Sequence, residues 1–362
     1  MNQPDLLQQR FPALRKVLPR VPLAALPTPV RQTELVLGHN RARISIKDDG
    51  GTGSLYGGNK VRKLEYLFGR IDRHRIERVA TYGTVASNHA LATAVYARHL
   101  GLQPICFLAH QTRTPLAATA LARHLDLGTE LVPFRGNRRS RIALQRQSLV
   151  NRRATVIPMG GSSWSGCVGF ITAGLELSEQ IDAGLLPCPD RLYIATGTMG
   201  TAAGLALGLA LAERPVEVHA VRVSDVAIAN GPVLKRLMQK CCYMLNRLDG
   251  RFPADLHEKV RIRLRDEFFG PGYAKSTPET DTAIDIAGSQ GGLALEATYT
   301  GKGFAALLND LQNESTAGTH SLFWNTYSSA PVSYGSEADV NKLPEEFRGY
   351  LDQEAPSSSE SD

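Results

Sequence analysis

Residues 191–205 read RLYIATGTMGTAAGL, which is an apolar β-rich run, a loop of glycines and hydroxyls, and the start of a helix. The same succession of strand, loop and helix recurs along the chain from about residue 41, which is typical of a parallel α/β fold. The segments with strand patterns are ARISIK (42–47), RVATYG (78–83), QPICFLA (103–109), ELVPF (130–134), ATVIPM (154–159), RLYIAT (191–196), VEVHAVRV (216–223) and HSLFWN (320–325).

So many strands are unusual for a single domain, and we therefore expect two open α/β domains with parallel sheets. Ligands of such folds bind beyond the carboxyl ends of the strands, which predicts a cleft between the domains. The pattern predicts a discontinuous large domain of residues 1–74 and 181–350 and a small domain of residues 75–180. Residues 351–362 are polar and acidic, a composition typical of a disordered tail.

The composition is that of an ordinary globular protein, with 362 residues of which 43% are hydrophobic and 21% charged. Charges within the first 16 residues interrupt any apolar export signal, so we expect a cytoplasmic protein without a membrane partner. The five cysteines show neither CxxC nor framework spacing, and we expect no metal site.

The stretch Arg135–Arg153 is rich in arginine and contains no acid. Such a cluster can contact nucleic acid or an acidic partner, but without interleaved aromatics we expect a solvated helix face and no nucleic acid.

A lysine at the start of a helix is the first candidate for chemistry. Gly57-Gly58-Asn59 precedes KVRKLEYLFGR (60–70), in which apolar residues share one helical face. Asn59 is a good N-cap, so Lys60 is expected to open the helix. A helix N-terminus is electropositive and lowers the pKa of a neighbouring lysine, as a lysine that forms Schiff bases requires. An ordinary capped helix with surface lysines is the alternative.

Two further segments carry polar groups where a strand meets a helix. Ser87-Asn88-His89 follows the strand 78–83, and Gly197-Thr198-Met199-Gly200-Thr201 follows the strand 191–196. Free backbone N–H groups and hydroxyls at a helix N-terminus bind anions, which makes the second segment a candidate phosphate loop. It is neither a Walker loop nor GxGxxG, which disfavours ATP and NAD. Because the loop contains no lysine or arginine, we expect the helix N-terminus to supply its positive potential.

A lysine, Ser-Asn-His and a Gly-Thr loop in this order resemble the pyridoxal-phosphate (PLP) enzymes of fold type II, which are related to tryptophan synthase β. The segments GGNKVRKLEY, SNHA, PMGGSSWSGCVGF and YTGKGF more closely resemble the family of D-cysteine desulfhydrases and 1-aminocyclopropane-1-carboxylate (ACC) deaminases. The resemblance extends from about Leu26 to Thr326, which is most of the chain.

The resemblance implies PLP as the cofactor, with Lys60 as its Schiff-base lysine. It also implies that Asn88 bonds the phenolic oxygen of PLP and that Ser87 lies near the substrate's carboxylate and reacting carbons. The roles carried over are catalysis for Lys60, Ser87, Tyr273 and Tyr299; cofactor binding for Lys60, Asn59, Asn88, Gly197, Thr198, Met199, Gly200, Thr201, Thr326 and Thr300; and substrate binding for Ser87, Asn88, His89, Gly161 and Ser162.

Departures from the family pattern bear on the substrate. Ala86 stands where the family has Gln, Met199 replaces a small residue, and the family's His-Thr-Gly-Gly reads Asn325-Thr326-Tyr327-Ser328. Thr300 stands where ACC deaminases have Glu. A hydroxyl facing the pyridine nitrogen supplies a hydrogen bond without a charge, so the ring would stay largely unprotonated. We expect Thr326 in that place, with Thr300 as the second candidate.

These features favour α,β-elimination on a small amino acid, with D-cysteine or a related D-amino acid giving a keto acid and ammonia. Two alternatives stay open. One is ACC-type ring opening or β-replacement in a specialised pathway, and the other, from a different class, is a non-catalytic sensor of PLP or an amino acid. By the same resemblance we expect a homodimer.

Overall fold

The computed structural model of the chain describes residues 5–134, 153–312, 318–330 and 340–351. It contains two compact units, both discontinuous in sequence. The first comprises residues 1–72 and 158–330, and the second comprises residues 73–157 and 331–362. Among the described residues, no helix is both long enough and apolar enough to cross a membrane. Most of the basic stretch 135–153 and nearly all of the tail 351–362 lie outside the described residues.

The first unit is built on a six-stranded sheet with strand order β1-β2-β10-β7-β8-β9. All of its pairs are parallel except β1 with β2, which form an antiparallel hairpin. The strands are β1 (Val30–Leu37), β2 (Asn40–Asp48), β7 (Arg191–Thr196), β8 (Glu217–Arg222), β9 (Ile262–Arg265) and β10 (Ser321–Asn325).

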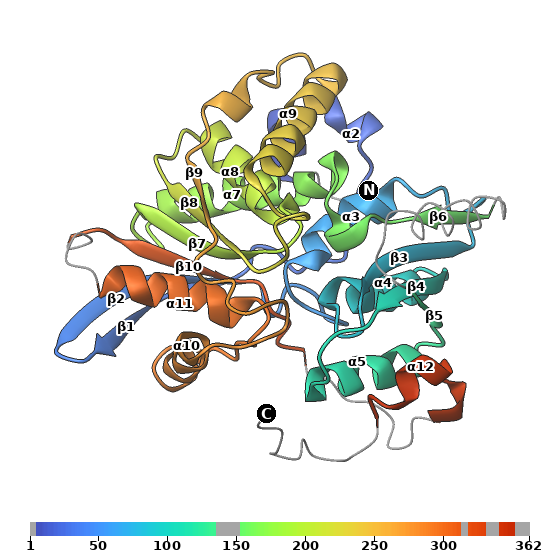
Figure 1. Cartoon of the computed structure of the whole chain (residues 1–362). Coiled ribbons are helices and arrows are strands. Elements are labelled where there is room, and N and C mark those ends of the chain that lie inside the picture. The colour runs from blue at the N-terminus through green and yellow to red at the C-terminus, as the bar shows by residue number, and fades with distance from the viewer. Residues whose placement is uncertain (1–4, 135–152, 313–317, 331–339, 352–362) are drawn as a thin grey trace. The chain divides into compact units, whose positions relative to one another are not determined.

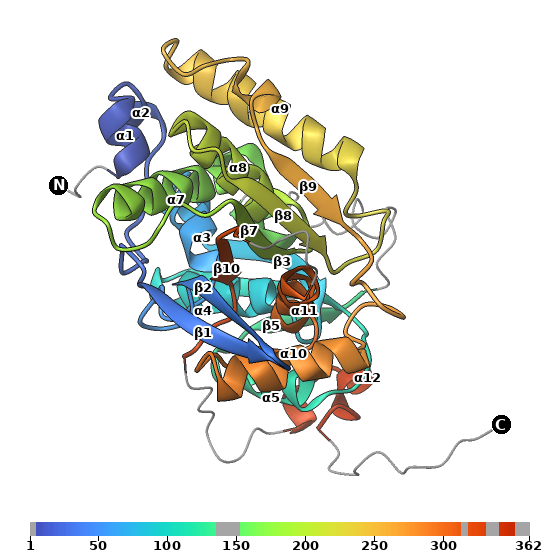
Figure 2. The same ribbon diagram turned by 90° about the vertical axis from the view of Figure 1, so that its left-hand side faces the viewer.

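Helices cover both faces of this sheet, as Figures 1 and 2 show. On one face, Leu192, Ile194 and Trp324 pack against α7 and α8. On the other, Tyr193 and Phe323 pack against α10 and α11, because successive side chains of a strand point to opposite faces. The helices are α1 (Leu6–Arg10), α2 (Leu14–Val17), α3 (Lys60–Gly69), α7 (Trp164–Asp182), α8 (Gly200–Leu211), α9 (Gly231–Leu248), α10 (Pro278–Ser289) and α11 (Thr300–Leu311), with the 3₁₀ turns η1 (Met159–Gly161) and η2 (Leu256–Glu258).

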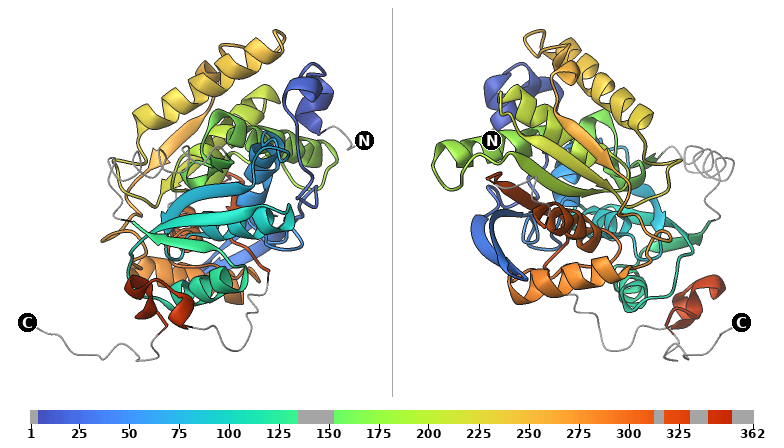
Figure 3. Two further views of the ribbon diagram at one scale, coloured as in Figure 1. Left: turned by 90° about the vertical axis from the view of Figure 1, so that its right-hand side faces the viewer. Right: turned by 60° about the vertical axis from the view of Figure 1, so that its left-hand side comes forward.

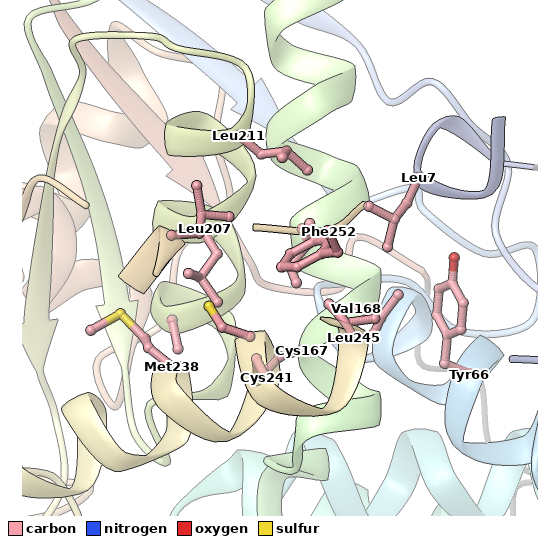
Figure 4. Close-up of a cluster of buried hydrophobic side chains, with 14 of the residues drawn as sticks. Leu7, Tyr66, Cys167, Val168, Leu207, Leu211, Met238, Cys241, Leu245 and Phe252 are labelled. Atoms are coloured by element: carbon pink, nitrogen blue, oxygen red, sulfur yellow. The ribbon is translucent and has the colours of Figure 1, made fainter. Parts of the chain in front are cut away.

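A third apolar cluster joins α7, α8 and α9 beyond the sheet (Figure 4). Cys167 and Val168 of α7 pack there with Leu207 of α8 and Cys241 of α9, and all four side chains are fully buried. Met199, the residue before α8, belongs to the same cluster. The turn at the start of α8 is therefore anchored in a hydrophobic core.

The second unit has a four-stranded parallel sheet with strand order β5-β4-β3-β6. Its described C-terminal residues pack on α5. Leu121 of α5 and Phe347 of α12 belong to the same buried cluster, and α5 and α12 lie side by side in both views of Figure 3. Its elements are β3 (Arg78–Thr84), α4 (Asn88–His99), β4 (Gln103–Ala109), α5 (Pro115–Asp126), β5 (Glu130–Pro133), β6 (Ala154–Val156), η4 (Val340–Lys342) and α12 (Glu345–Arg348).

The α/β class is confirmed, and each segment with a strand pattern contains a strand. Strands β1 and β9 were not predicted, and β1 makes the larger sheet mixed rather than purely parallel. The two units also differ from the predicted domain boundaries. Residues 158–180 belong to the first unit, because α7 packs on α3 and α8. The described residues 340–351 belong to the second unit, where the Tyr350 hydroxyl donates to the Gln111 carbonyl at 2.7 Å.

Candidate active site

Helix α3 begins at Lys60, and the turn before it is held against the end of β10. Gly58 has a φ of +83°, a conformation that favours glycine, and a Cβ there would lie 2.8 Å from the Thr326 carbonyl oxygen. The backbone N–H of Asn59 donates to the same carbonyl at 3.2 Å. The turn before Lys60 and the end of β10, which are far apart in the sequence, are therefore in contact.

Asn59 has a role other than the expected N-cap. Its side chain makes no capping bond, because both ends of its amide are engaged elsewhere. The amide oxygen accepts from the Lys60 amine at 2.8 Å, and the amide nitrogen donates to the Thr201 hydroxyl at 3.0 Å. A single side chain thus connects Lys60 to the candidate phosphate loop.

The Lys60 amine lies in an environment that disfavours its charged form. Burial, and then the positive charge of Lys63, lower its pKa from 10.5 to about 7, although Glu296 opposes the shift. Burial and a neighbouring cation therefore account for the lowered pKa, which was expected from the helix N-terminus. A substantial fraction of the amine is neutral at neutral pH and able to act as a nucleophile or base.

The loop of residues 197–201 turns into α8 as the sequence predicts. Met199 adopts a left-handed conformation with φ of +65°, and α8 begins at Gly200. The backbone N–H of Gly200 donates to the Ser162 hydroxyl at 3.1 Å, and the hydroxyls of Ser162 and Thr198 lie 2.7 Å apart. The Met199 side chain is buried in the apolar cluster, so only its backbone can contact a ligand in this loop.

Lys63 is a site residue that sequence reasoning missed. Its amine donates to the Gly160 carbonyl at 3.1 Å, and a Cβ on Gly200 would lie 3.0 Å from this amine and 2.5 Å from the Ser162 hydroxyl. Burial lowers the pKa of the Lys63 amine to about 8, so it remains largely charged at neutral pH. The cation that the loop lacks therefore comes from α3. Its position one helical turn after Lys60 was the available signal, since residues i and i+3 share a helix face.

The two tyrosines that the family resemblance singles out are in contact. The hydroxyls of Tyr273 and Tyr299 are 2.6 Å apart, and their rings meet edge to face. A Cβ on Gly197 would lie 3.2 Å from the Tyr299 ring, which places this ring beside the candidate phosphate loop. Burial and Tyr273 raise the pKa of Tyr299 well above its ordinary value, so its hydroxyl stays protonated and can donate.

Thr300 and Glu296 form hydrogen bonds with each other at the start of α11. The Thr300 hydroxyl donates to the Glu296 carboxylate at 3.2 Å and accepts from the Glu296 N–H at 3.0 Å. The carboxylate also accepts from the backbone N–H groups of Thr298, Tyr299 and Thr300 at 2.8–2.9 Å. This is an anionic cap on the helix N-terminus, and the only hydrogen of the Thr300 hydroxyl is used in it.

Ser87, Asn88 and His89 lie in the second unit, at the start of α4. The Ser87 hydroxyl accepts from the Ala90 N–H at 3.2 Å and caps the helix. His89 is buried, and its Nε2 lies 2.9 Å from the Thr81 hydroxyl. Asn88 is half-buried and is the first residue of the helix.

The first unit thus provides a cradle for an anionic group beside a lysine of lowered pKa. Its donors are the Gly200 N–H, the hydroxyls of Ser162, Thr198 and Thr201, and the Lys63 ammonium, none of which is a carboxylate. The absence of a Cβ on Gly200 lets the Ser162 hydroxyl and the Lys63 amine approach its backbone closely. This donor set suits a phosphate ester whose reactive carbon reaches Lys60, which is how PLP is bound and used.

Comparison with known proteins agrees with this chemistry. The family model described as "Pyridoxal-phosphate dependent enzyme" matches residues 21–324. The chain is 30% identical to a D-cysteine desulfhydrase of Klebsiella pneumoniae over 306 residues, which cover 81% of this chain and 88% of the relative. It is 32% identical to the nocardicin C-9' epimerase of Nocardia uniformis over 318 residues, which cover 85% and 92%.

Solved structures show the same relationship. An ACC deaminase homologue superposes with a TM-score of 0.70 at 27% identity and covers 87% of this chain and 93% of its own. An aspartate racemase that uses pyridoxal 5'-phosphate shares the fold, with a TM-score of 0.57 at 17% identity over 88% of this chain and 92% of its own. Together with the Lys60 site and its anion cradle, these likenesses establish that the chain belongs to the pyridoxal-phosphate-dependent enzymes of fold type II.

Proposed function

We propose that this PLP enzyme catalyses α,β-elimination on a small D-amino acid such as D-cysteine, with Lys60 as the residue that binds the cofactor aldehyde. The observation that carries the proposal is the Asn59 bridge, which joins the Lys60 amine to Thr201 at the start of α8 through bonds of 2.8 and 3.0 Å. It connects the reactive lysine to the anion cradle through one side chain within the first unit.

The cradle residues would hold the phosphate. The Gly200 N–H and the hydroxyls of Ser162, Thr198 and Thr201 supply neutral donors, and Lys63 supplies a full charge. Charge-assisted hydrogen bonds are roughly twice as strong as neutral ones, so Lys63 is expected to contribute more than any single hydroxyl. Met199 contributes through its backbone alone.

Bound PLP supplies the electron sink that weakens the bonds at the substrate's α-carbon. The protein moves the protons. Lys60, with its pKa near 7, takes the α-proton, and the Tyr273–Tyr299 pair donates a proton to the departing sulfur. With one water molecule, D-cysteine would then yield pyruvate, ammonia and hydrogen sulfide.

We also propose, from the family resemblance, that Ser87 binds the substrate carboxylate and that Asn88 binds the phenolic oxygen of PLP. His89, the next residue, and Gly161, the last residue of the η1 turn that contacts Lys63, are proposed as further substrate-binding residues. Assembly as a homodimer and a cytoplasmic location belong to the same proposal. Gel filtration of the purified chain tests the first of these directly.

An acidic side chain in the cradle should weaken binding of the PLP phosphate. We expect Gly200→Asp to weaken PLP binding by more than about tenfold, or about 1.4 kcal/mol, because its carboxylate would lie among Ser162, Lys63 and the phosphate. Gly231→Asp is the matched control, since Gly231 opens α9, is exposed and has nothing within 4 Å of a Cβ. Equilibrium titration with PLP gives both affinities, and equal values for the two variants would remove the cradle from this loop.

Lys63 should also affect the pKa of the Lys60 amine. Its positive charge lowers the pKa of Lys60, so Lys63→Met should raise that pKa. Only the neutral amine adds to an aldehyde, and the rate at which cofactor-free protein takes up pyridoxal should therefore rise at a higher pH than in the wild type. Pyridoxal carries no phosphate, which separates this effect from loss of the phosphate contact. Lys235→Met, on the exposed side of α9, should keep the wild-type profile, whereas an unmoved profile in Lys63→Met would contradict the coupling.

Thr326 is the proposed partner of the pyridine nitrogen, because it adjoins the Lys60 turn while the Thr300 hydrogen is engaged by Glu296. Thr326→Val should lose one hydrogen bond, about 1 kcal/mol or roughly fivefold in PLP affinity, and shift the visible absorption of the bound cofactor. Thr300→Val should lower the melting temperature through the α11 cap and leave the absorption unchanged. The reverse pattern would assign the role to Thr300.

Epimerisation at the α-carbon is a second candidate, favoured by the 32% identity to the nocardicin C-9' epimerase. It needs the same Lys60 to remove the α-proton, and it needs a group that returns a proton to the opposite face instead of protonating a leaving group. Reaction in D₂O separates the two functions: an epimerase places deuterium at the α-carbon of recovered amino acid, and an elimination lyase releases keto acid.

The decisive experiment is a substrate screen with identification of the modified lysine. We expect turnover of D-cysteine or β-chloro-D-alanine and little of ACC, because a neutral hydroxyl beside the ring nitrogen gives a milder electron sink. Lys60→Ala should lower the rate by at least about a hundredfold. Borohydride reduction and peptide mapping should place the pyridoxyl group on Lys60. Efficient ACC opening without elimination, or a label on Lys63 or Lys302, would contradict the proposal.

A further inference from the structure

Beneath the start of α3 lies a buried group of two cations and two carboxylates. Arg62 and Asp49 form one ion pair with side chains 1% and 0% exposed, and Lys47 and Glu176 form another, 0% and 6% exposed. The four residues come from β2, the turn after it, α3 and α7. Burial alone would raise the pKa of Glu176, but Arg62 and Lys47 lower it to about 2. Its carboxylate therefore remains charged at neutral pH.

Arg62 is the centre of this group. Its guanidinium donates from Nε and Nη2 to the two Asp49 oxygens at 3.0 and 2.9 Å, and from Nη1 and Nη2 to the two Glu176 oxygens at 2.9 and 3.0 Å. Nη2 also donates to the Thr28 hydroxyl at 2.8 Å, and that hydroxyl donates to Asp49 at 2.9 Å. A lysine could carry the charge but not this paired geometry, since an ammonium lacks the planar fork.

The main chain of Asp49 extends the contact to both ends of the proposed cofactor site. Its carbonyl accepts from the Gly58 N–H at 2.8 Å, two residues before Lys60. Its N–H donates to the Asn325 carbonyl at 3.1 Å, one residue before Thr326. The side chain of Asp49 is thus held by Arg62 while its backbone holds the two short segments that carry Lys60 and Thr326.

We infer that Arg62 is a positioning residue that, through Asp49, sets the Lys60 amine relative to Thr326. This inference rests on the proposed function, in which Lys60 binds the aldehyde of PLP and Thr326 faces its ring nitrogen. A rigid cofactor ring must satisfy both residues at once. Movement of Asp49 therefore changes the fit of the ring even when the fold is retained.

Arg62→Lys tests this inference, and Arg265→Lys is the matched control. Arg265 is 6% exposed, lies in the same unit, and donates to the two Asp310 oxygens at 2.7 and 3.0 Å, but it connects β9 to α11 instead of the Lys60 turn. For both holoenzymes we would measure the melting temperature, the PLP affinity, and the pH midpoint of the visible absorption of the bound cofactor. We expect both variants to melt earlier, and only Arg62→Lys to lose at least about tenfold in PLP affinity and to shift the midpoint.

A milder variant keeps the test valid if Arg62→Lys does not fold. Thr28→Val removes only the hydroxyl between Arg62 and Asp49 and should shift the same two quantities in the same direction by less. Wild-type affinity and midpoint in Thr28→Val, or an Arg62→Lys enzyme indistinguishable from Arg265→Lys, would overturn the inference. A wild-type protein that binds no PLP would instead refute the proposed function itself.

Discussion

The site depends on the burial of two lysines one helical turn apart. Lys60 and Lys63 share a face of α3. Burial lowers the pKa of both amines, and the charge of Lys63 lowers that of Lys60 further. The pKa falls from 10.5 to about 7 for Lys60 and to about 8 for Lys63. In the proposed function Lys60 takes the covalent role and Lys63 holds the anionic group. A phosphate bound next to Lys63 would offset the charge of Lys63 that lowers the pKa of Lys60, so the proposed function couples cofactor binding to the chemistry of Lys60.

Much of the fold could be predicted because its strands carry a clear signal. RLYIAT and HSLFWN each have a continuous apolar centre, as strands between two helical layers must have, and both are central in the larger sheet. Strands β1 and β9 escaped prediction because they are its edges, where polar residues such as those of Ile262–Arg265 blur the pattern. The boundary near residue 180 was misplaced because α7 follows a strand of the second unit in sequence and packs on the helices of the first.

The candidate site shows the same division between local and distant causes. Lys60 at a helix start and Gly200 at another could be predicted, since both follow from local turn and helix signals. The bridge formed by Asn59 could not, because it depends on α3 and α8 meeting in space, and the only sequence signal for Lys63 was its position one turn after Lys60. The family resemblance favoured Thr326 over Thr300 as the partner of the pyridine nitrogen. The structure adds a physical reason, because the Thr300 hydroxyl donates to the Glu296 carboxylate.

Met199 links the shape of the candidate phosphate loop to the packing of an apolar core. Its backbone shapes the anion-binding turn with φ of +65°, while its thioether fills the apolar cluster that α7, α8 and α9 share. A non-glycine residue in this conformation costs of order 1–3 kcal/mol and persists only where its surroundings over-determine it. The shape of a polar loop is thus set partly by the volume of an apolar core. Substitutions among the buried thiols and leucines of that core could adjust how tightly the cofactor is retained without altering any polar atom that touches it.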